Sequence, residues 1–426
     1  MLERAFILST GDELTTGRTV DTNANFIADK LVAIGVDVVG ILVVGDYPDR
    51  LAWAWRQAMQ QAEMVISTGG IGPTADDLTT ETVATVTGRS LWLSEEVADR
   101  IRQLFQAMSR PMPENNLKQA RFPHGATIIP NALGTAPGFR LAFASEWGPR
   151  QLIVMPGVPR EMKPMFEDQV LPWLRETRGA QDIYLSHTFQ TFGVSESGLD
   201  QLVAGAVDPA EGRISFRAAF PQISVRVTVH GRPAEAQTRL EAAAARLRER
   251  IGDYCYGEGD TSMEEVVGRL LVERRATLAV AESCTGGLIG HRLTNVPGSS
   301  AYVVGDIVAY SNAVKASILG VGEATLDCHG AVSTEVATEM AAGARRLTGA
   351  TFGLATTGIA GPDGGTPEKP VGTVCLALVA VERTYAHRYQ LWGTREWVKT
   401  LTSQIALDWV RRALLGSDPT ASGFRR

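Results

Sequence analysis

The feature of the sequence that most limits its fold is a repeated succession of short apolar strands and amphipathic helices. In the first part of the chain the expected strands are RAFILST (4–10), VDVVGILVVG (36–45), EMVISTGG (63–70) and RQLIVMPGVP (150–159). Between them, apolar residues recur at helical spacing in 24–34, and Pro48 opens a helix over 48–61. Such alternation predicts a parallel sheet with helices on both faces, and ligands at the carboxyl ends of its strands.

The same pattern returns after residue 261. The expected strands there are TLAVAES (277–283), YVVGDIVAYS (302–311), TFGLATTG (351–358) and VGTVCLALVAV (371–381). Residues 183–252 differ, because a strictly alternating strand is followed by an Ala-rich helix, which indicates a small α+β module with one open sheet face and a structural role. We therefore predict an α/β protein, with two parallel-sheet α/β domains (1–178 and 257–426) joined by a small α+β middle domain (179–256).

Composition excludes several classes of function. A chain of 426 residues is too long for a single ordinary core. Its net charge of −6 and the lack of a Lys/Arg cluster argue against direct nucleic-acid binding, although local loops can still bind small anions. Four cysteines, far apart and without a CxxC pair, indicate neither a zinc site nor a disulfide framework.

The start of the chain, its hydropathy and its helix composition give expectations for localisation and oligomeric state. MLERAFILST carries an acid and a base before only a short apolar run, so it does not resemble a secretory signal. No stretch is long and apolar enough to span a membrane, so we expect a cytoplasmic protein with no membrane partner. Ala-rich helices and the open face of the middle sheet predict a homodimer.

A glycine-rich segment, STGGIGPTADDLTTE (67–81), follows a buried strand and precedes a helix. Backbone N–H groups at Gly69, Gly70 and Gly72, with Thr74, are expected to hold a phosphate. The acidic residues Asp76 and Asp77 come next and would repel that phosphate without a cation, so the pattern predicts a metal-assisted phosphate or pyrophosphate site. The alternative is that Asp77 only caps the following helix.

A second segment, AESCTGG (281–287), lies between a strand and a helix, where side chains point outward and free amides favour negative charge. It suits a nucleophile, Ser283 or Cys284, with its oxyanion bound by the amides of Thr285, Gly286 and Gly287. It equally suits a phosphate cradle without catalysis.

Eight motifs, taken together, resemble the CinA family over nearly the whole chain. In the first part these are GDELTTG (11–17), TGGIGPTADDLTTE (68–81), NNLKQA (115–120), NALGTAPGF (131–139) and MPGVPREM (155–162). In the last part they are AESCTGG (281–287), GDIVAYSNAVK (305–315) and TTGIAGPDGGTPEKPVGTV (356–374).

The resemblance implies properties for each end of the chain. The first part is similar to molybdopterin-binding proteins of the MoaB/MogA type. There Asp77 and Asp46 match the acidic positions, and the family implies ADP-ribose pyrophosphatase activity that needs a divalent metal (Mg, Mn or Co) and potassium. Ile71 replaces the threonine usual in molybdopterin proteins, which argues against cofactor biosynthesis.

The last part resembles nicotinamide mononucleotide deamidase, an amidohydrolase of pyridine nucleotide salvage that requires no cofactor. The family implies a dyad of Ser283 as nucleophile and Lys315 as base, with Tyr310 positioning the lysine or the leaving group. A lysine can serve as base only when neutral, which requires burial or a cationic neighbour. Cys284 is the rival nucleophile, but without a histidine partner we expect it to pack inward.

The segment GIAGPDGG (358–365) offers a loop for the 5′-phosphate of the nucleotide. Its expected substrate-binding residues are Thr357, Gly358, Gly361, Gly364 and Gly365, with Thr357 standing where relatives commonly have serine. An ordinary turn is the alternative, since glycine and proline mark turns in general.

Two other functions compete with this interpretation. The family name implies a competence or DNA-damage adaptor that binds a recombination protein and catalyses little. A molybdopterin-handling protein is the third candidate, but it leaves the last domain unexplained.

Overall fold

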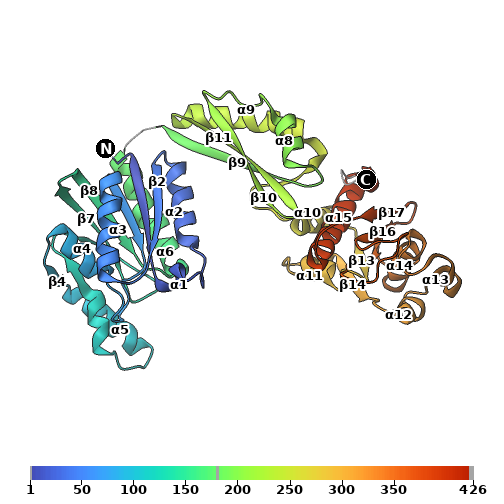
Figure 1. The fold of residues 1–426 in the computed structure, drawn as a ribbon, viewed down its shortest axis with the longest axis horizontal. Coiled ribbons are helices and arrows are strands. Elements are labelled where there is room, and N and C mark those ends of the chain that lie inside the picture. Colours follow the sequence, from blue (N-terminus) through green and yellow to red (C-terminus); the bar gives the residue numbers. More distant parts are fainter. Residues whose placement is uncertain (1, 179–181, 422–426) are drawn as a thin grey trace. The chain divides into compact units, whose positions relative to one another are not determined.

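A computed structural model describes residues 2–178 and 182–421 of the chain (Figure 1). By their contacts the residues group into two compact units. One comprises Met1–Leu185 with Val229–Thr238, and the other comprises Ser186–Thr228 with Arg239–Arg426. The domain boundaries expected from the sequence remain predictions, and the first of them adjoins residues 179–181, which lie outside the described residues.

The first unit contains a six-stranded sheet in the order β2-β1-β3-β8-β7-β6. Its strands are β1 (Arg4–Thr10), β2 (Asp37–Val44), β3 (Met64–Thr68), β6 (Thr127–Ile129), β7 (Gly138–Ser145) and β8 (Gly148–Met155). The first four strands in the sheet order pair in parallel, as predicted, whereas β7 and β6 add an antiparallel edge. The connection from β7 to β8 is only two residues long, which is too short for a parallel crossover.

Helices cover both faces of this sheet. On one face lie α2 (Thr22–Ala33), α6 (Pro159–Met165), the π-helical segment Phe166–Val170 and α7 (Leu171–Arg178); on the other lie α3 (Pro48–Gln61), α4 (Thr79–Thr87) and α5 (Glu95–Ala107). Two neighbouring residues of β1 point to opposite faces: Ile7 packs in the core under α2, and Leu8 packs in the core under α3. The helical stretch after β8 changes from α6 to a π-helical segment after Pro164, because proline lacks the N–H that a regular helix needs.

Smaller elements complete the unit. These are α1 (Asp12–Thr15), the 3-10 helix Glu114–Ala120, and the two-stranded pair β4 (Leu91–Leu93) and β5 (Arg121–Pro123).

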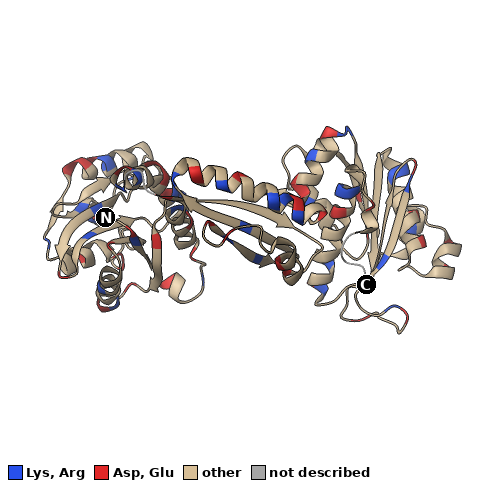
Figure 2. Ribbon diagram, turned by 90° about the horizontal axis from the view of Figure 1, so that it is seen from above, with Lys and Arg blue, Asp and Glu red and all other residues tan. Residues whose placement is uncertain are grey.

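The middle part of the chain forms the sheet β10-β11-β9-β12. Its elements are β9 (Ile183–Thr191), α8 (Glu196–Val203), β10 (Gly212–Ala219), β11 (Gln222–Gly231), α9 (Pro233–Ile251) and β12 (Cys255–Glu258). The alternation in β11 holds only in part, because Val225, Val227 and Val229 are buried and Arg226 is exposed, but Thr228 is buried too. Figure 2 shows acidic and basic residues interspersed along α9, so this helix presents no stripe of one charge.

The last part contains a five-stranded sheet in the order β14-β13-β15-β16-β17. Its strands are β13 (Leu278–Glu282), β14 (Val303–Val308), β15 (Phe352–Gly358), β16 (Thr373–Val379) and β17 (Thr384–Gln390). The pairs of β13 with β14 and with β15 are parallel, as predicted, but β16 and β17 are antiparallel. Both α/β sheets are therefore mixed: parallel strands, which carry the predicted motifs, form one side of each sheet, and antiparallel strands form the other.

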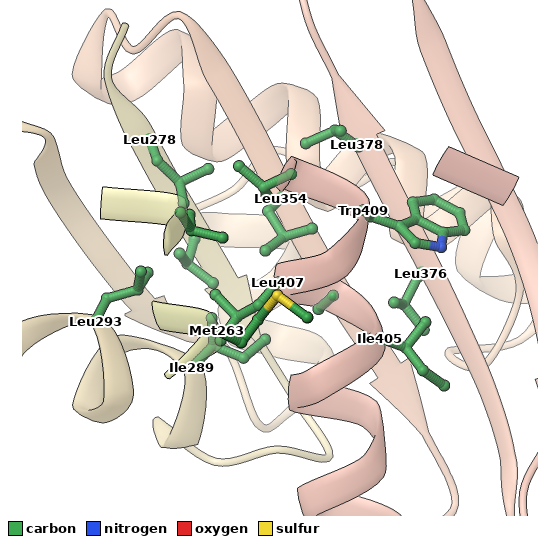
Figure 3. Close-up of a cluster of buried hydrophobic side chains, with 14 of the residues drawn as sticks. Met263, Leu278, Ile289, Leu293, Leu354, Leu376, Leu378, Ile405, Leu407 and Trp409 are labelled. Carbon is green, nitrogen blue, oxygen red and sulfur yellow. The ribbon is translucent and has the colours of Figure 1, made fainter. Parts of the chain in front are cut away.

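Large apolar side chains fill one side of this sheet and small ones the other. Helices α10 (Met263–Glu273), α11 (Leu288–Thr294) and α15 (Arg395–Leu414) pack on the first side, where Leu278, Leu354 and Trp409 belong to one buried cluster (Figure 3). On the second side the core is rich in alanine, and α14 (Thr334–Thr348) approaches so closely that Gly353 has no room for a β-carbon. Two short helices, α12 (Asn312–Ser317) and α13 (Glu323–His329), connect β14 to α14.

The middle sheet and the last sheet share part of their packing. Phe192 and Tyr256, from the middle part, belong to the same buried cluster as α10 and α15. The ring of Phe220, at the turn between β10 and β11, stacks on Trp397 of α15 with 4.4 Å between centroids.

No helix among the described residues is both long and apolar enough to cross a membrane.

Candidate active site

The predicted turn after β13 holds Ser283 in a defined position. Its N–H donates to the carbonyl of Thr356 at 3.0 Å, which continues the pairing of β13 with β15. The N–H of Gly286 then donates back to the Ser283 carbonyl at 3.1 Å. Gly286 and Gly287 have φ values of 62° and 90°, a left-handed conformation that glycine adopts without strain. The two glycines therefore make the abrupt change from strand to helix that leaves the serine hydroxyl at the end of the sheet.

Lys315 lies beside this serine. Its Nζ is 3.0 Å from Ser283 Oγ, and the lysine is only 1% exposed. The same Nζ donates to the carbonyls of Ala309 and Tyr310, at 2.9 and 3.3 Å. Burial lowers the pKa of the Lys315 ammonium, and no carboxylate pairs with it in the part of the chain described here. In these contacts Nζ donates to the two carbonyls and to Ser283 Oγ, as an ammonium does. After loss of one proton the amine can keep both carbonyl bonds and accept from the serine hydroxyl instead.

Cys284 is in a different environment. It is 5% exposed, and its sulfur packs so closely against Gly358 that a β-carbon there would lie 3.1 Å from it. Burial raises the pKa of its thiol to about 12, so the thiol stays protonated at neutral pH. The expectation that this cysteine packs inward is therefore confirmed.

The amides expected to bind an oxyanion are partly occupied. The N–H of Gly287 donates to Glu282 Oε2 at 2.9 Å, and the N–H of Gly286 donates to the Ser283 carbonyl. Within the described residues, the N–H groups of Cys284 and Thr285 have no acceptor. The hydroxyl of Thr285 is committed to Thr356 Oγ1 at 2.8 Å. Of these two residues only Cys284 lines the cavity in front of Ser283, so an oxyanion there would find its free donor at the N–H of Cys284 rather than at the two glycines.

Glu282 holds the backbone of the turn after β13 by accepting hydrogen bonds, and Asp306 packs beside it. Both carboxylate oxygens of the fully buried Glu282 accept N–H donors, from Gly287 and from Gly290 at 2.8 Å. Asp306, on the neighbouring strand β14, packs against Gly290 with no room for a β-carbon there. Burial, and then the charge and hydrogen bond of Glu282, raise the pKa of Asp306 to about 7. Since both oxygens of Glu282 already accept hydrogen bonds, we place the shared proton on Asp306.

A cavity of about 190 Å³ opens in front of the serine. It is lined by Ser283, Cys284, Tyr310, Asn312, Lys315, Ala331, Val332, Thr357, Gly358, Ala360 and Arg395. Of the predicted residues, the structure thus brings together Ser283, Lys315, Tyr310, Thr357 and Gly358. Thr285, Gly286, Gly287, Gly361, Gly364 and Gly365 do not line the cavity in the described structure.

Two of these lining residues differ in detail from the expectation. Only the carbonyl of Tyr310 contacts Lys315, because its ring is 60% exposed and its hydroxyl accepts from Arg395 at 2.8 Å. The hydroxyl of Thr357 donates to the carbonyl of Ala331 at 2.7 Å, so this threonine holds the opposite wall of the cavity.

Sequence reasoning missed Asn312 and Arg395. Arg395 is the first residue of α15 and also donates to the carbonyl of Gly361 at 2.8 Å. A signal for it was present, because a cation at a helix N-terminus opposes the helix dipole and is unfavourable without another role.

The motifs of the first unit also meet at the carboxyl ends of parallel strands. The N–H of Gly69 donates to the carbonyl of Met155 at 3.0 Å, and the Thr79 hydroxyl donates to the Gly69 carbonyl at 2.9 Å. Asn115 and Lys118 donate to the carbonyls of the loop that follows, at Pro73 and Thr74. The glycine loop is therefore held in place by β8, α4 and the 3-10 helix.

The acidic residues of this unit have distinct partners. Asp77 Oδ2 accepts from the N–H and hydroxyl of Thr74, at 2.8 and 2.5 Å, and it lies close against Gly72. The residue that precedes α4 is Leu78, so the alternative that Asp77 caps this helix is wrong. Asp76 is exposed, and the nearby Thr74 lowers its pKa, although the hydroxyl proton of Thr74 is directed at Asp77.

Asp46 accepts from the N–H of Asp12 at 3.0 Å, and its pKa is raised by burial and then by neighbouring carboxylates, among them Asp76. In residues 2–178 and 182–421, however, no three His, Cys, Asp or Glu side chains converge closely enough to hold a metal ion. Asp46, Asp76 and Asp77 thus do not form a ready metal site in this conformation, and their roles as ligands stay predictions. No metal-dependent step is derived from them.

Comparison with known proteins bears on the whole chain. Three family models match it in order: a probable molybdopterin binding domain over residues 6–176, a damage-inducible protein CinA KH domain over 186–257, and a CinA C-terminal domain over 260–414. A putative competence-damage inducible protein of Caldanaerobacter subterraneus is 40% identical over 97% of this chain and 99% of its own length. The chain belongs to the CinA family. The resemblance seen in the motifs is thereby confirmed.

Other members of the CinA family are similar to the same extent. A CinA-like protein of Geotalea uraniireducens is 42% identical over 96% of this chain and 97% of its own length. Among solved structures, a CinA protein of unknown function from Thermoplasma acidophilum is 34% identical, with a TM-score of 0.36 over 39% of this chain and 96% of its own length.

Proposed function

We propose that the chain hydrolyses the carboxamide of nicotinamide mononucleotide to the carboxylate and ammonia at the site of Ser283. The observation that carries this proposal is the buried contact of 3.0 Å between Ser283 Oγ and Lys315 Nζ. A lysine whose pKa is lowered by burial can take the proton of a serine hydroxyl, and serine with lysine is an established arrangement for amide hydrolysis. The cavity in front of the serine gives an amide access to it.

The reaction proceeds in two halves. Ser283 Oγ attacks the carboxamide carbon while its proton passes to Lys315 Nζ, and the N–H group of Cys284 stabilises the oxyanion. The C–N bond then breaks, Lys315 returns the proton to the leaving nitrogen, and ammonia departs from an acyl-serine. Water loses a proton to Lys315 and attacks the ester carbon. The serine oxygen then regains a proton, and nicotinate mononucleotide is released.

Ammonia release by purified variants tests the proposal. Ser283→Ala removes the atom that forms the acyl bond and is expected to lower kcat by several orders of magnitude. Lys315→Met should be nearly as damaging, and the double variant little worse than either, because residues that act as one unit are not additive. Ser300→Ala, at an exposed serine of the same unit, is the matched control.

The pH profile separates a base from a structural lysine. Activity should rise with pH as Lys315 loses its proton, over a range below the ordinary lysine pKa because burial lowers it. A folded wild-type protein that releases no ammonia at any pH would refute the deamidase. It would favour instead the role that the relatives' names suggest, a competence or damage-response protein acting through a protein partner.

The first unit supports a further proposal: binding, and metal-dependent hydrolysis, of ADP-ribose at the glycine loop. The supporting observation is the left-handed pair Gly69 and Gly70, held rigidly at the carboxyl ends of parallel strands where phosphates commonly bind.

A further inference from the structure

The middle sheet has one covered face and one open face. Helix α9 runs along the covered face (Figure 1), where the guanidinium of Arg248 lies over the ring of Phe189 at 5.8 Å and Val225 is buried. The open face carries the alternate residues of β9 and β11, which bond in pairs across the two strands. The pairs are Ser186 with Thr228 at 3.0 Å, Arg226 with Thr188 at 3.4 Å, and Ser224 with Gln190 at 2.6 Å.

Strand β10 adds two arginines to this open face. A turn of two residues, 220–221, joins β10 to β11, which places Ser215 opposite Arg226 in the hairpin. Arg213 and Arg217 lie on the same side as Ser215, and all three are exposed while the residues between them are half-buried. At about 3.4 Å per residue, the two arginines of β10 are about 14 Å apart along the strand. Three arginines therefore share one face of the sheet.

No acidic side chain balances these arginines within the described strands β9, β10 and β11, because their sequences contain neither Asp nor Glu. The acidic residues beside them, Glu211 before β10 and Glu258 at the end of β12, pair with Arg239 and Arg248 of α9. The chain as a whole carries a net charge of −6, and its Lys and Arg are not clustered along the sequence. The three arginines become neighbours only in the folded sheet, where they form a local positive surface that attracts an anion.

The side chains of the open face indicate which kind of anion fits. Interfaces between proteins, those of homodimers included, have an apolar core, whereas the residues of this face are Arg, Ser, Thr and Gln. These are the side chains that contact phosphate and sugar oxygens of nucleic acids. A four-stranded sheet is too broad for a groove of duplex DNA, which admits a helix or a two-stranded ribbon, but a single strand can lie across it.

We propose that the open face of the middle sheet binds the sugar-phosphate backbone of single-stranded nucleic acid through Arg213, Arg217 and Arg226. The contacts are to phosphate oxygens, so binding does not depend on base sequence. None of the residues that line the Ser283 cavity in the described structure belongs to this sheet, so the inference is independent of the deamidase.

Fluorescence anisotropy with the full chain tests this inference. The probe is labelled oligothymidylate of about 20 nucleotides, longer than the roughly 4–16 nucleotides that one small domain covers. For three phosphate contacts to a single strand, the logarithm of the affinity should fall against the logarithm of the salt concentration with a slope of about −2. The variant Arg213→Gln/Arg217→Gln/Arg226→Gln should bind about tenfold or more weakly at low salt, and its slope should approach zero.

Two further variants guard against trivial explanations. Arg213→Gln/Arg217→Gln leaves the bond from Arg226 to Thr188 in place, so it should keep the fold, confirmed by circular dichroism, and lose most of the slope. The matched control removes the same charge from exposed arginines outside the middle sheet and should bind like wild type: Arg56→Gln/Arg110→Gln/Arg269→Gln.

Several results would overturn the assignment. These are a wild-type chain that does not bind at low salt, unchanged binding in the triple variant of the sheet, and equal weakening in the control. Polyglutamate that displaces the probe as well as unlabelled oligothymidylate does would assign the face to an acidic protein instead. Tighter binding of a duplex of the same length would refute the choice of a single strand.

Discussion

Replacing Asp306 by asparagine should stabilise the protein at neutral pH and leave it unchanged at low pH. Asp306 lies against Gly290 and shares a hydrogen bond with the buried Glu282, whose two oxygens hold the start of α11. The pair needs one proton, and asparagine supplies an N–H donor in place of the carboxyl O–H without a titrating group.

The sign and size of the effect follow from linkage. The pKa of Asp306 is about 7 in the folded chain, against an ordinary value of 3.8, so the folded state binds more protons between these two values. Wild-type stability therefore falls as pH rises through this window and levels off above it, whereas the Asn variant has no such loss. The full interval of about 3 units corresponds to a ceiling of about 4 kcal/mol. Since Asp306 is more than a third exposed, solvent screening reduces the expected difference to about 1–2 kcal/mol.

Denaturant unfolding at pH 4.5 and at pH 8 measures this difference. The Asp306→Asn variant should exceed wild type only slightly at pH 4.5, which lies near the lower end of this window, and should unfold at a clearly higher denaturant concentration at pH 8. Asp327→Asn, which removes an exposed aspartate of the same unit, is the control. An Asp306→Asn variant that is no more stable than wild type at pH 8, or equally more stable at both pH values, would contradict a shared proton at this turn.

Three further outcomes are expected. Cys284→Ala should retain substantial ammonia release, because its thiol is protonated and packed against Gly358; a dead Cys284→Ala beside an active Ser283→Ala would move the nucleophile to sulfur. Asp77→Asn should weaken cleavage of ADP-ribose assayed with Mg²⁺, Mn²⁺ or Co²⁺ and leave deamidation intact, and loss of both activities would count against separate sites. Asp408→Ala should lower the free energy of unfolding by about 3–5 kcal/mol, because two buried arginines lose their only acidic partner among the described residues; a change below about 1 kcal/mol would show that these charges reach water.

The apolar pattern of the sequence predicted the bounds of individual helices and strands well where local residues alone determine them. The helix opened by Pro48 ends at Gln61, as its apolar spacing indicates, and the strand RAFILST has the expected bounds. The antiparallel edges of both sheets were not foreseen, because direction depends on how short the connection is and not on the apolar pattern of a strand.

Some residues of the candidate site could be identified from the sequence and others could not. Ser283 and Lys315 stand in motifs long enough to identify from sequence, and the structure brings their side chains together. Arg395 was missed because its contact with Tyr310 joins residues 85 positions apart. The hydrogen bond from the Gly287 N–H to Glu282 was missed because the sequence shows an acidic residue before a turn but not the direction of its side chain.

The shared packing of Phe192, Tyr256 and Phe220 with the last sheet matters for anyone who would shorten this chain. A fragment that begins near residue 260 keeps every group that lines the Ser283 cavity. It lacks the rings of Phe192 and Tyr256 in the buried cluster, and Phe220 no longer stacks on Trp397. Trp397 and the buried cluster would then present apolar surface to solvent, which favours aggregation of such a fragment. A fragment that begins ahead of β9 retains these contacts.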